Sequence, residues 1–362
     1  MKKLPLVIDP VNPGALELGH ESLKSLLSGL DSNAVLRARQ LERWILQGRA
    51  TKFEDMSDLP AQLRSILPLK LVPLTCSVAH GSTALDGTRK LLIKLADSHT
   101  VETVLMFEDD RRTVCISTQV GCGMGCTFCA SGIAGVARNL KSHEILEQLL
   151  LARNELPASE RITHVVVMGM GEPMANLANL LEALSIATSP KGLGISARNV
   201  TISTVGIPGK ILELAESGRK YHLAISLHAP EDALRSRLMP TNEKTGIQAI
   251  LEAAGEFFTK TGRQVTYEYI LLGGVNDRQE DAESLGKLLE GRKAHVNLIP
   301  FNPVDGLPWN RPDNEAIARF RQSLEKRRVS ASVRKRKGAD IDAACGQLRR
   351  RHEAPKAKWP SS

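Results

Sequence analysis

From residue 113 onward the chain alternates between short strand-like segments and longer helix-like segments, and this repeat limits the folds that it can adopt. The strand-like segments are "TVCIST" (113–118), "HVVVM" (164–168), "NVTIST" (199–204), "HLAISL" (222–227), "VTYEYIL" (265–271) and "HVNLI" (295–299). Helical patterns lie near residues 142–154, 176–188, 208–217, 246–260 and 278–290. Repeated βα units of this kind, six when "TVCIST" is included, predict an α/β protein with a parallel sheet and right-handed crossovers.

The chain before this repeat shows two other patterns. Residues 14–30, 33–48 and 59–67 carry apolar side chains at helical spacing and predict three helices. From Thr88, the strand-like segments "TRKLLIKLA" and "VETVLMF" precede "TVCIST", with turn-forming residues between them, and predict a small antiparallel meander. We therefore expect a helical domain at 1–84, a meander linker at 85–107, a core domain at 108–337 and a C-terminal segment at 338–362.

The segments that follow the predicted strands differ from ordinary turns. They are a cysteine-rich loop (122–129), "GMGEP" (169–173), "TVGIPG", "HAPED", "GGVND" and "PFNPVD". In parallel α/β folds, ligands bind at the carboxyl ends of the strands, where these segments would meet. The pattern predicts an active site on this face.

The N-terminus lacks the pattern of a secretion signal, because Asp9 and Pro10 interrupt its apolar run. We expect a cytoplasmic protein that does not associate with a membrane, since no stretch approaches the roughly 18 apolar residues of a membrane span.

Positive charge is concentrated at the end of the chain. The formal net charge is +8, and residues 333–362 hold nine lysines and arginines against three acidic residues. Such a tail is typical of a solvated chain end, and it would also attract a phosphate backbone. The charge alone does not decide between these interpretations.

Three of the six cysteines lie within eight residues, in "VGCGMGCTFCASG" (120–132). Cys122, Cys126 and Cys129 have the spacing Cys-x3-Cys-x2-Cys. A structural zinc site normally has four protein ligands, and no fourth Cys or His lies at zinc-finger spacing. Three thiolates with an open fourth position suit an iron–sulfur cluster with one iron free to bind substrate. Zinc binding and chance clustering are the alternatives.

This loop, placed after the first strand of a βα repeat, resembles the signature of radical S-adenosylmethionine (SAM) enzymes. The chain is further similar to the RlmN/Cfr family of radical SAM RNA methyltransferases, from about residue 34 to residue 348. The segments that carry this resemblance are "ETVLMFEDDRRTVCISTQVGCGMGCTFCASG", "RNL", "VVVMGMGEPMANL", "VTISTVG", "AISLHAP", "NLIPFNP" and "KGADIDAACGQL".

The resemblance implies a partial (β/α)6 barrel with an RNA-binding N-terminal helical domain and a basic C-terminal extension. It implies a [4Fe-4S] cluster held by Cys122, Cys126 and Cys129, with SAM as co-substrate. The implied SAM contacts are Gly171, Glu172, Ser203, Ser226, Leu227, His228 and Asn302. Considered alone, Glu172 would be a helix N-terminal acid and His228 a hydrogen-bonded buried histidine.

The resemblance also implies a reaction in which Cys345 accepts a methyl group from one SAM before a second SAM is cleaved to a radical. Cys115 would then resolve the protein–RNA adduct through a transient disulfide with Cys345. Glu102 would be the proton acceptor, and burial in an apolar strand would favour that role. Considered alone, Cys115 would be a buried small hydrophobe and Glu102 an outward-facing strand residue.

The partners implied are 23S rRNA, tRNA and an electron donor such as flavodoxin or ferredoxin, with the chain acting as a monomer. Methylation would occur at adenine C2 (RlmN type), with C8 (Cfr type) as the alternative. A ferredoxin-type carrier is disfavoured because it needs four ligands for each cluster. A basic RNA-binding protein with a structural metal site would hold zinc rather than iron.

Overall fold

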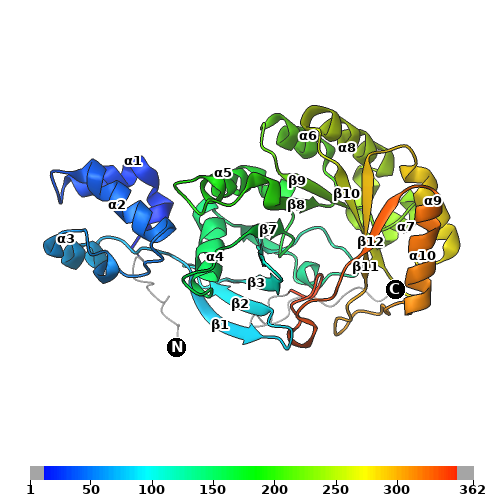
Figure 1. Ribbon diagram of the computed structural model, residues 1–362, viewed down its shortest axis with the longest axis horizontal. Coiled ribbons are helices and arrows are strands. Elements are labelled where there is room, and N and C mark those ends of the chain that lie inside the picture. Colours follow the sequence, from blue (N-terminus) through cyan, green and yellow to red (C-terminus); the bar gives the residue numbers. More distant parts are fainter. Residues whose placement is uncertain (1–11, 349–362) are drawn as a thin grey trace, which may run out of the picture.

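A ten-stranded mixed sheet forms the centre of the computed structural model, which describes residues 12–348 (Figure 1). Its strands are β1 (Ser77–Thr83), β2 (Arg89–Lys94), β3 (Thr100–Glu108), β4 (Arg111–Cys115), β7 (His164–Val167), β8 (Val200–Thr204), β9 (His222–Ser226), β10 (Val265–Leu271), β11 (Ala294–Pro300) and β12 (Ser330–Val333). They lie across the sheet in this same order. Neighbours from β1 to β4 are antiparallel, and neighbours from β4 to β12 are parallel.

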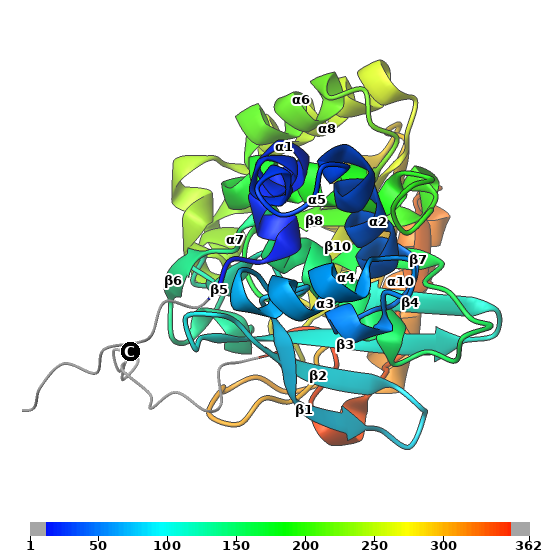
Figure 2. The ribbon, with the colours of Figure 1, turned by 90° about the vertical axis from the view of Figure 1, so that its left-hand side faces the viewer.

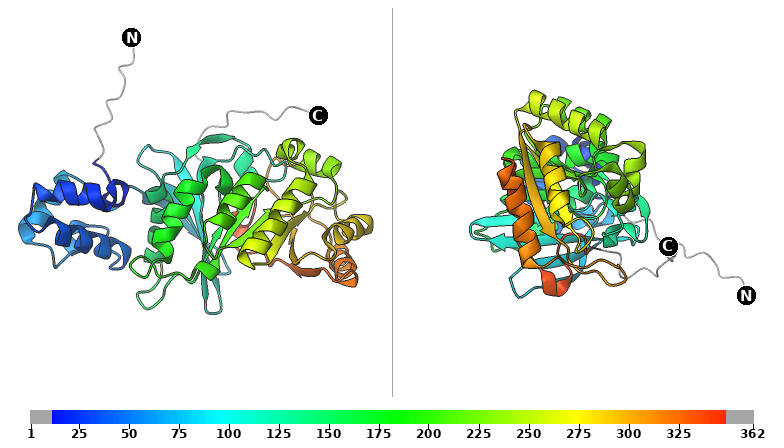
Figure 3. Two further views of the ribbon diagram at one scale, coloured as in Figure 1. Left: turned by 90° about the horizontal axis from the view of Figure 1, so that it is seen from above. Right: turned by 90° about the vertical axis from the view of Figure 1, so that its right-hand side faces the viewer.

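Helices follow each of the first six parallel strands, and the repeat predicted those after the first five. They are α4 (Ser142–Asn154), α5 (Leu177–Thr188), α6 (Pro208–Glu216), α7 (Asp232–Leu238), α8 (Ile247–Thr261), α9 (Gln279–Leu289) and α10 (Asn314–Lys326). They lie on the outer side of the curved sheet (Figure 3). The sheet runs from β1 to β12 without closing, so the predicted α/β class and partial barrel with six βα units are confirmed.

Four of these elements were not predicted from the sequence. Helix α10 and strand β12 complete the sixth βα unit, and α7 precedes α8 in the fourth. Strand β1 is exposed at nearly every position, so it lacks the alternation that marks a half-buried strand. The sheet consequently begins at Ser77, inside the range 1–84 that we expected to be helical.

The three helices predicted near the N-terminus are present as α1 (Ala15–Ser28), α2 (Ala34–Leu46) and α3 (Ala61–Ile66). They form a separate group at one end of the molecule, beside α4 and the antiparallel strands (Figures 1 and 2). The Arg153 guanidinium of α4 donates to the carbonyls of Ile45 and Leu46 at the end of α2. These bonds join the helical group to the barrel.

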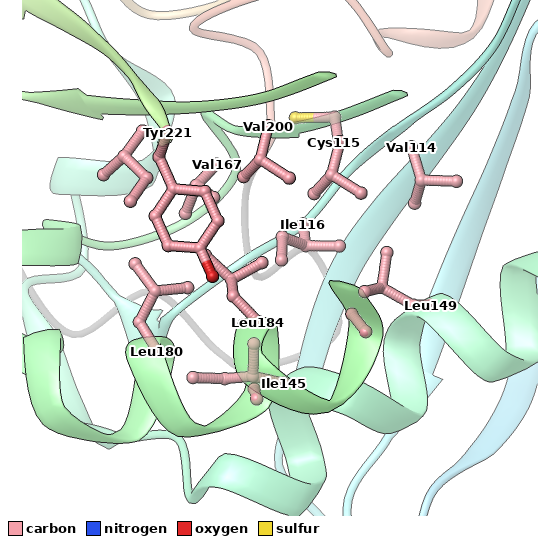
Figure 4. Packing of buried hydrophobic residues seen from close by; sticks show 14 of the residues in the cluster. Val114, Cys115, Ile116, Ile145, Leu149, Val167, Leu180, Leu184, Val200 and Tyr221 are labelled. Carbon is pink, nitrogen blue, oxygen red and sulfur yellow. The ribbon is translucent and has the colours of Figure 1, made fainter. Parts of the chain in front are cut away.

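The largest core lies between the sheet and its helices, and Figure 4 shows part of it. Val114 and Ile116 pack towards Ile145 and Leu149 of α4. Cys115 lies between these two residues in the sequence, and its sulfur points away from α4 (Figure 4). Because side chains alternate across a strand, packing of β4 against α4 directs Cys115 into the barrel.

No helix within residues 12–348 is long and apolar enough to cross a bilayer.

A buried carboxylate on α4 holds the segment that enters β1. Oε2 of Glu147 accepts hydrogen bonds from the Cys76 backbone N–H at 2.6 Å and from the Thr75 hydroxyl at 3.1 Å. Oε1 of Glu147 is buried without a hydrogen-bond partner among the described residues. Burial raises the pKa of Glu147 from 4.5 to about 7.

The substitution Glu147→Gln should therefore change how stability depends on pH. Because the folded pKa of Glu147 lies above its ordinary value, the wild-type protein loses free energy of unfolding as the pH rises from 4.5 through about 7. The variant lacks this titration, so its stability relative to wild type should increase over that interval by on the order of 2 kcal/mol. Urea denaturation at both ends of the interval measures this. Glu256→Gln, at an exposed position of α8, is the control. Parallel pH profiles for wild type and Glu147→Gln would contradict the assignment.

Candidate active site

The cysteine-rich loop is fixed at its start by a short hairpin of β5 (Gln119–Gly121) and β6 (Val136–Asn139). Gly121 has φ 82°, and a Cβ there would lie 2.0 Å from the carbonyl oxygen of Gly135. The Cys122 N–H donates to that same carbonyl at 3.0 Å. Only glycine permits this approach, which turns the chain into the loop that carries Cys122, Cys126 and Cys129.

Just before this loop, Ser117 connects three parts of the barrel. Its hydroxyl donates to the Glu102 carbonyl of β3 at 2.7 Å and accepts from the Met170 N–H beyond β7 at 2.9 Å. The buried amide of Gln148 on α4 bonds both the N–H and the carbonyl of Ser117. The loop therefore leaves the sheet from a fixed point.

A cavity of about 150 Å³ opens at the carboxyl ends of the parallel strands, and we call it the cluster cavity. Nine of the residues expected in the site line it: Cys122, Cys126, Cys129, Gly171, Glu172, Ser203, Ser226, His228 and Cys345. The predicted position of the site at the strand ends agrees with this cavity.

Glu172 is buried, and both of its carboxylate oxygens are engaged. Oε1 accepts from the Met174 N–H at 3.0 Å, which caps the short 3-10 helix Pro173–Asn176. Oε2 accepts from the Val205 N–H at 2.9 Å, at the end of β8. Burial raises the pKa of Glu172. The N-terminal acid expected here is therefore present, and the same side chain lines the cavity.

Ser203 and Ser226 lie on the inner face of β8 and β9, while Ile202 and Ile225 beside them are fully buried. Ser226 is paired in register with Glu268 of β10. The buried Glu268 carboxylate accepts a hydrogen bond from Asn297 of β11 at 2.8 Å, and burial raises its pKa. Ser226, Glu268 and Asn297 thus form a row of polar side chains across β9, β10 and β11.

His228 is a neutral buried imidazole at the cavity wall. Its Nδ1 accepts from the Ile270 N–H at 2.9 Å, which places the ring proton on Nε2. Burial lowers the pKa of His228 to about 3. Its ring meets Phe128 edge to face with centroids 4.8 Å apart. Phe128, between two of the cysteines, therefore shields the loop together with His228.

Leu227 does not line the cavity, because its side chain is fully buried in the main core. Its backbone instead takes part in a structural network around Arg235 of α7. The Arg235 guanidinium donates to the carbonyls of Val205 at 2.6 Å, Ser226 at 3.0 Å and Leu227 at 3.0 Å. One buried cation thus joins the ends of β8 and β9.

The segment after β12 returns to the mouth of the barrel and places Cys345 there. The Ala130 N–H donates to the Gly346 carbonyl at 2.8 Å, and the Ser131 hydroxyl donates to the Leu348 carbonyl at 2.6 Å. At its other end, the Leu85 N–H donates to Asp340 at 3.0 Å. The segment is held between the cysteine loop and the β1–β2 turn.

A second cavity, of about 40 Å³, lies behind this segment, and we call it the thiol cavity. Cys115, Asn302 and Cys345 line it, and Cys345 lines the cluster cavity as well. Burial, with Cys345 nearby, raises the pKa of Cys115 to about 12. Asn302 donates to the Cys345 carbonyl at 3.3 Å, and its Oδ1 is buried without a hydrogen-bond partner among the described residues.

Glu102 is buried on β3, as expected, and it lines neither cavity. Its carboxylate forms an ion pair with Lys90 of β2 at 3.1 Å. The same Lys90 ammonium donates to the Asp342 carbonyl at 3.2 Å. Lys90 therefore connects Glu102 to the segment that carries Cys345.

The three cysteines of the loop suit an iron–sulfur cluster chemically. Burial raises the pKa of each thiol, and that of Cys122 to about 12, so thiolates here need a compensating positive charge such as iron. Within residues 12–348, no three His, Cys, Asp or Glu side chains are grouped closely enough to hold a single metal ion. In an iron–sulfur cluster, each of the three thiolates would bind a separate iron.

Sequence reasoning missed Arg235, Glu268 and Lys90, and also Arg334, which lines both cavities. A signal existed for Glu268, since it interrupts an apolar strand in "VTYEYIL" just as Glu102 does in "VETVLMF". Cys76 is buried beside Glu147 and lines neither cavity, and burial raises its pKa.

Comparisons with known proteins place this site in a family. Residues 116–285 match the Radical SAM superfamily, whose members use a [4Fe-4S] cluster and SAM. Residues 15–71 match the "Ribosomal RNA large subunit methyltransferase N-terminal domain".

Whole-chain relatives extend the match. A protein of Rhodopirellula baltica named "Probable dual-specificity RNA methyltransferase RlmN" is 50% identical over 99% of this chain and 98% of its own. One of the same name from Bacillus subtilis is 46% identical over 86% of each chain. The crystal structure of a radical SAM methyltransferase from Sphaerobacter thermophilus is 40% identical, covers 94% of this chain and 99% of its own, and superposes with a TM-score of 0.87. Because identity of this degree extends over nearly the whole length, the chain belongs to the RlmN family of radical SAM methyltransferases.

Proposed function

We propose that this protein methylates C2 of an adenine in 23S rRNA and in tRNAs, through an S-methylcysteine at Cys345 and a transient disulfide with Cys115. The observation that carries the proposal is the position of Cys345, which lines both the cluster cavity and the thiol cavity. A thiol in that position can face SAM on one side and Cys115 on the other. The "dual-specificity RNA methyltransferase RlmN" names of the relatives support RlmN-type methylation rather than modification at C8.

When bound, the cluster and SAM supply a transferable methyl group and a radical that can remove hydrogen from an unactivated carbon. The chain contributes the groups that bind and orient them. Cys122, Cys126 and Cys129 would hold three irons, and the polar wall of Gly171, Glu172, Ser203, Ser226 and His228 would contact SAM. Asn302, on the wall of the adjoining thiol cavity, would complete this set, since its buried Oδ1 accepts no hydrogen bond from the described residues.

The two remaining cysteines would act at different times. Cys345 would accept the methyl group as a thiolate and then carry the carbon that bonds to adenine. Glu102 would take the proton that leaves the ring, with Lys90 fixing its carboxylate. Cys115 would finally attack the sulfur of Cys345, which releases the methylated RNA and leaves a disulfide.

Further parts of the proposal concern partners. The helical domain at 1–84 and the basic C-terminal residues would bind RNA, and a flavodoxin or ferredoxin would supply the electron. The proposed enzyme acts as a monomer and consumes two SAM for each methylation. The basic residues 349–351 lie outside the described residues. Mass spectrometry of nucleosides from cells with and without this gene tests the proposed product directly.

Changing any one of Cys122, Cys126 or Cys129 to Ala should abolish both the bound iron and SAM cleavage, because each thiolate holds one iron. Iron analysis and detection of 5′-deoxyadenosine after anaerobic purification measure the two effects. Cys76→Ala is the matched control, and it should keep both. A triple Ala variant that still bound iron and cleaved SAM would rule out these ligands.

Replacing the two special cysteines should separate their places in the reaction. Cys115→Ala should accumulate RNA bonded to Cys345, because the thiol that would break the adduct is missing. Cys345→Ala should accumulate none, because no methyl group reaches the protein. Denaturing gels of protein purified from cells, with and without RNase, measure the adduct.

The double variant is the control for this order of events, and it should behave as Cys345→Ala does. Adducts in both single variants, or in neither, would show that the assigned roles are wrong.

A further inference from the structure

The outer part of the thiol cavity is lined by basic side chains that the proposed chemistry does not use. Arg311 approaches from the loop after β11, and residues 334–337, "RKRK", approach from the segment after β12. These five residues line the same cavity as Cys115 and Cys345. Positive charge therefore surrounds the entrance to the two thiols.

Within the described part of the chain, these charges have no carboxylate partner at ion-pair distance. Among the ion pairs formed within residues 12–348, none includes Arg311 or any residue from 334 to 337. The carboxylate of Glu268 interacts electrostatically with Arg334, and that of Asp86 with Lys337. Arg311, Lys335 and Arg336 are exposed to solvent.

Arg311 and Arg336 are close enough to repel one another. Burial, and then the charge of Arg336, lower the pKa of Arg311. Its Nη1 donates to the carbonyls of Pro300 and Phe301, both at 3.3 Å, which fixes the guanidinium at the end of β11. Two guanidinium groups on the wall of one cavity form a site suited to an anion.

The position of the pair identifies which anion suits it. The cavity wall beyond it contains the small apolar residues Ala343 and Ala344 next to Cys345, so a flat base can approach the thiol there. An enzyme that modifies a base must take it out of its stack, and the phosphates on either side of that base then remain at the cavity entrance. A phosphodiester accepts paired hydrogen bonds from arginine, and such a contact carries no information about the base sequence.

We propose that Arg311 and Arg336, with Lys335 beside them, form a phosphate clamp that binds the RNA backbone directly beside the nucleotide being modified. This inference rests on the proposed function, because it takes RNA to be the substrate that reaches Cys345. It adds a specific contact beside the thiols to the RNA binding already proposed for the helical domain and the basic C-terminal residues.

The test compares binding of a protein-free 23S rRNA transcript by the full-length holoenzyme at several KCl concentrations. Arg311→Gln, Arg336→Gln and the double variant remove the clamp one charge at a time. For the double variant, the slope of log affinity against log salt should become shallower by about 1.4 to 1.8, the amount expected for two lost phosphate contacts. Arg311→Lys and Arg336→Lys keep the charge and should retain most of the slope.

The matched control is the double variant Arg319→Gln and Arg321→Gln, on the exposed side of α10. It removes the same charge from residues that pair with Glu315 and Glu325. Its salt slope should equal that of wild type. Iron content, thermal unfolding and methylation of the protein by SAM without RNA show that each variant is folded and loaded.

Three results would overturn the clamp. The first is an unchanged slope in the Arg311 and Arg336 double variant, and the second is an equal change in the control, which would reflect net charge alone. The third is loss of binding to polyglutamate but not to RNA, which would assign the pair to an acidic protein. If wild type methylates the transcript while the slopes stay equal, only the clamp is wrong. If wild type neither binds nor methylates RNA, the proposed function fails with it.

Discussion

The hydrogen bonds between the cysteine loop and the C-terminal segment determine the whole arrangement of the site. The Gly346 and Leu348 carbonyls accept from Ala130 and Ser131, which directly follow the last cluster cysteine. Residues more than 200 positions apart in sequence are thereby joined directly after Cys345. This contact holds Cys345 next to the loop, where its side chain lines both cavities.

The barrel provides the two surfaces that this contact joins. Parallel strands bring the segments after β4, β7, β8 and β9 to one face, and Arg235 ties the last two together through their carbonyls. The sixth βα unit then returns the chain along β12 to the same face. Because β12 pairs with β11 only, the C-terminal segment leaves from the open edge of the sheet and can cross the mouth of the barrel. Openness of the barrel is thus what allows the C-terminal segment to place the Cys345 thiol at this face.

Features with a local signal were predictable from the sequence. The spacing of Cys122, Cys126 and Cys129 follows from a single loop, and the periodic apolar residues gave the parallel strands that carry Ser203 and Ser226. Features that depend on long-range pairing were not predictable. β1 is an exposed edge strand without alternation, and Arg235 is a buried cation whose acceptors are backbone carbonyls. The partner of Glu102 depends on strand register, which places Lys90 opposite Val104 and so within reach of that carboxylate. The resemblance implied a SAM contact for Leu227, and the structure shows that its side chain packs in the hydrophobic core.

The central claim is that Cys345 itself receives the methyl group, and labelled SAM tests it most directly. The reduced, reconstituted protein would be incubated with SAM carrying an isotopic methyl group, without RNA, and digested for peptide mass spectrometry. The account predicts one labelled methyl group on the peptide that contains Cys345 and none on the peptide that contains Cys115. After RNA is added, the label should appear in methyladenosine. Label on Cys115, or methylation of RNA by a protein that carries no label on Cys345, would contradict the account.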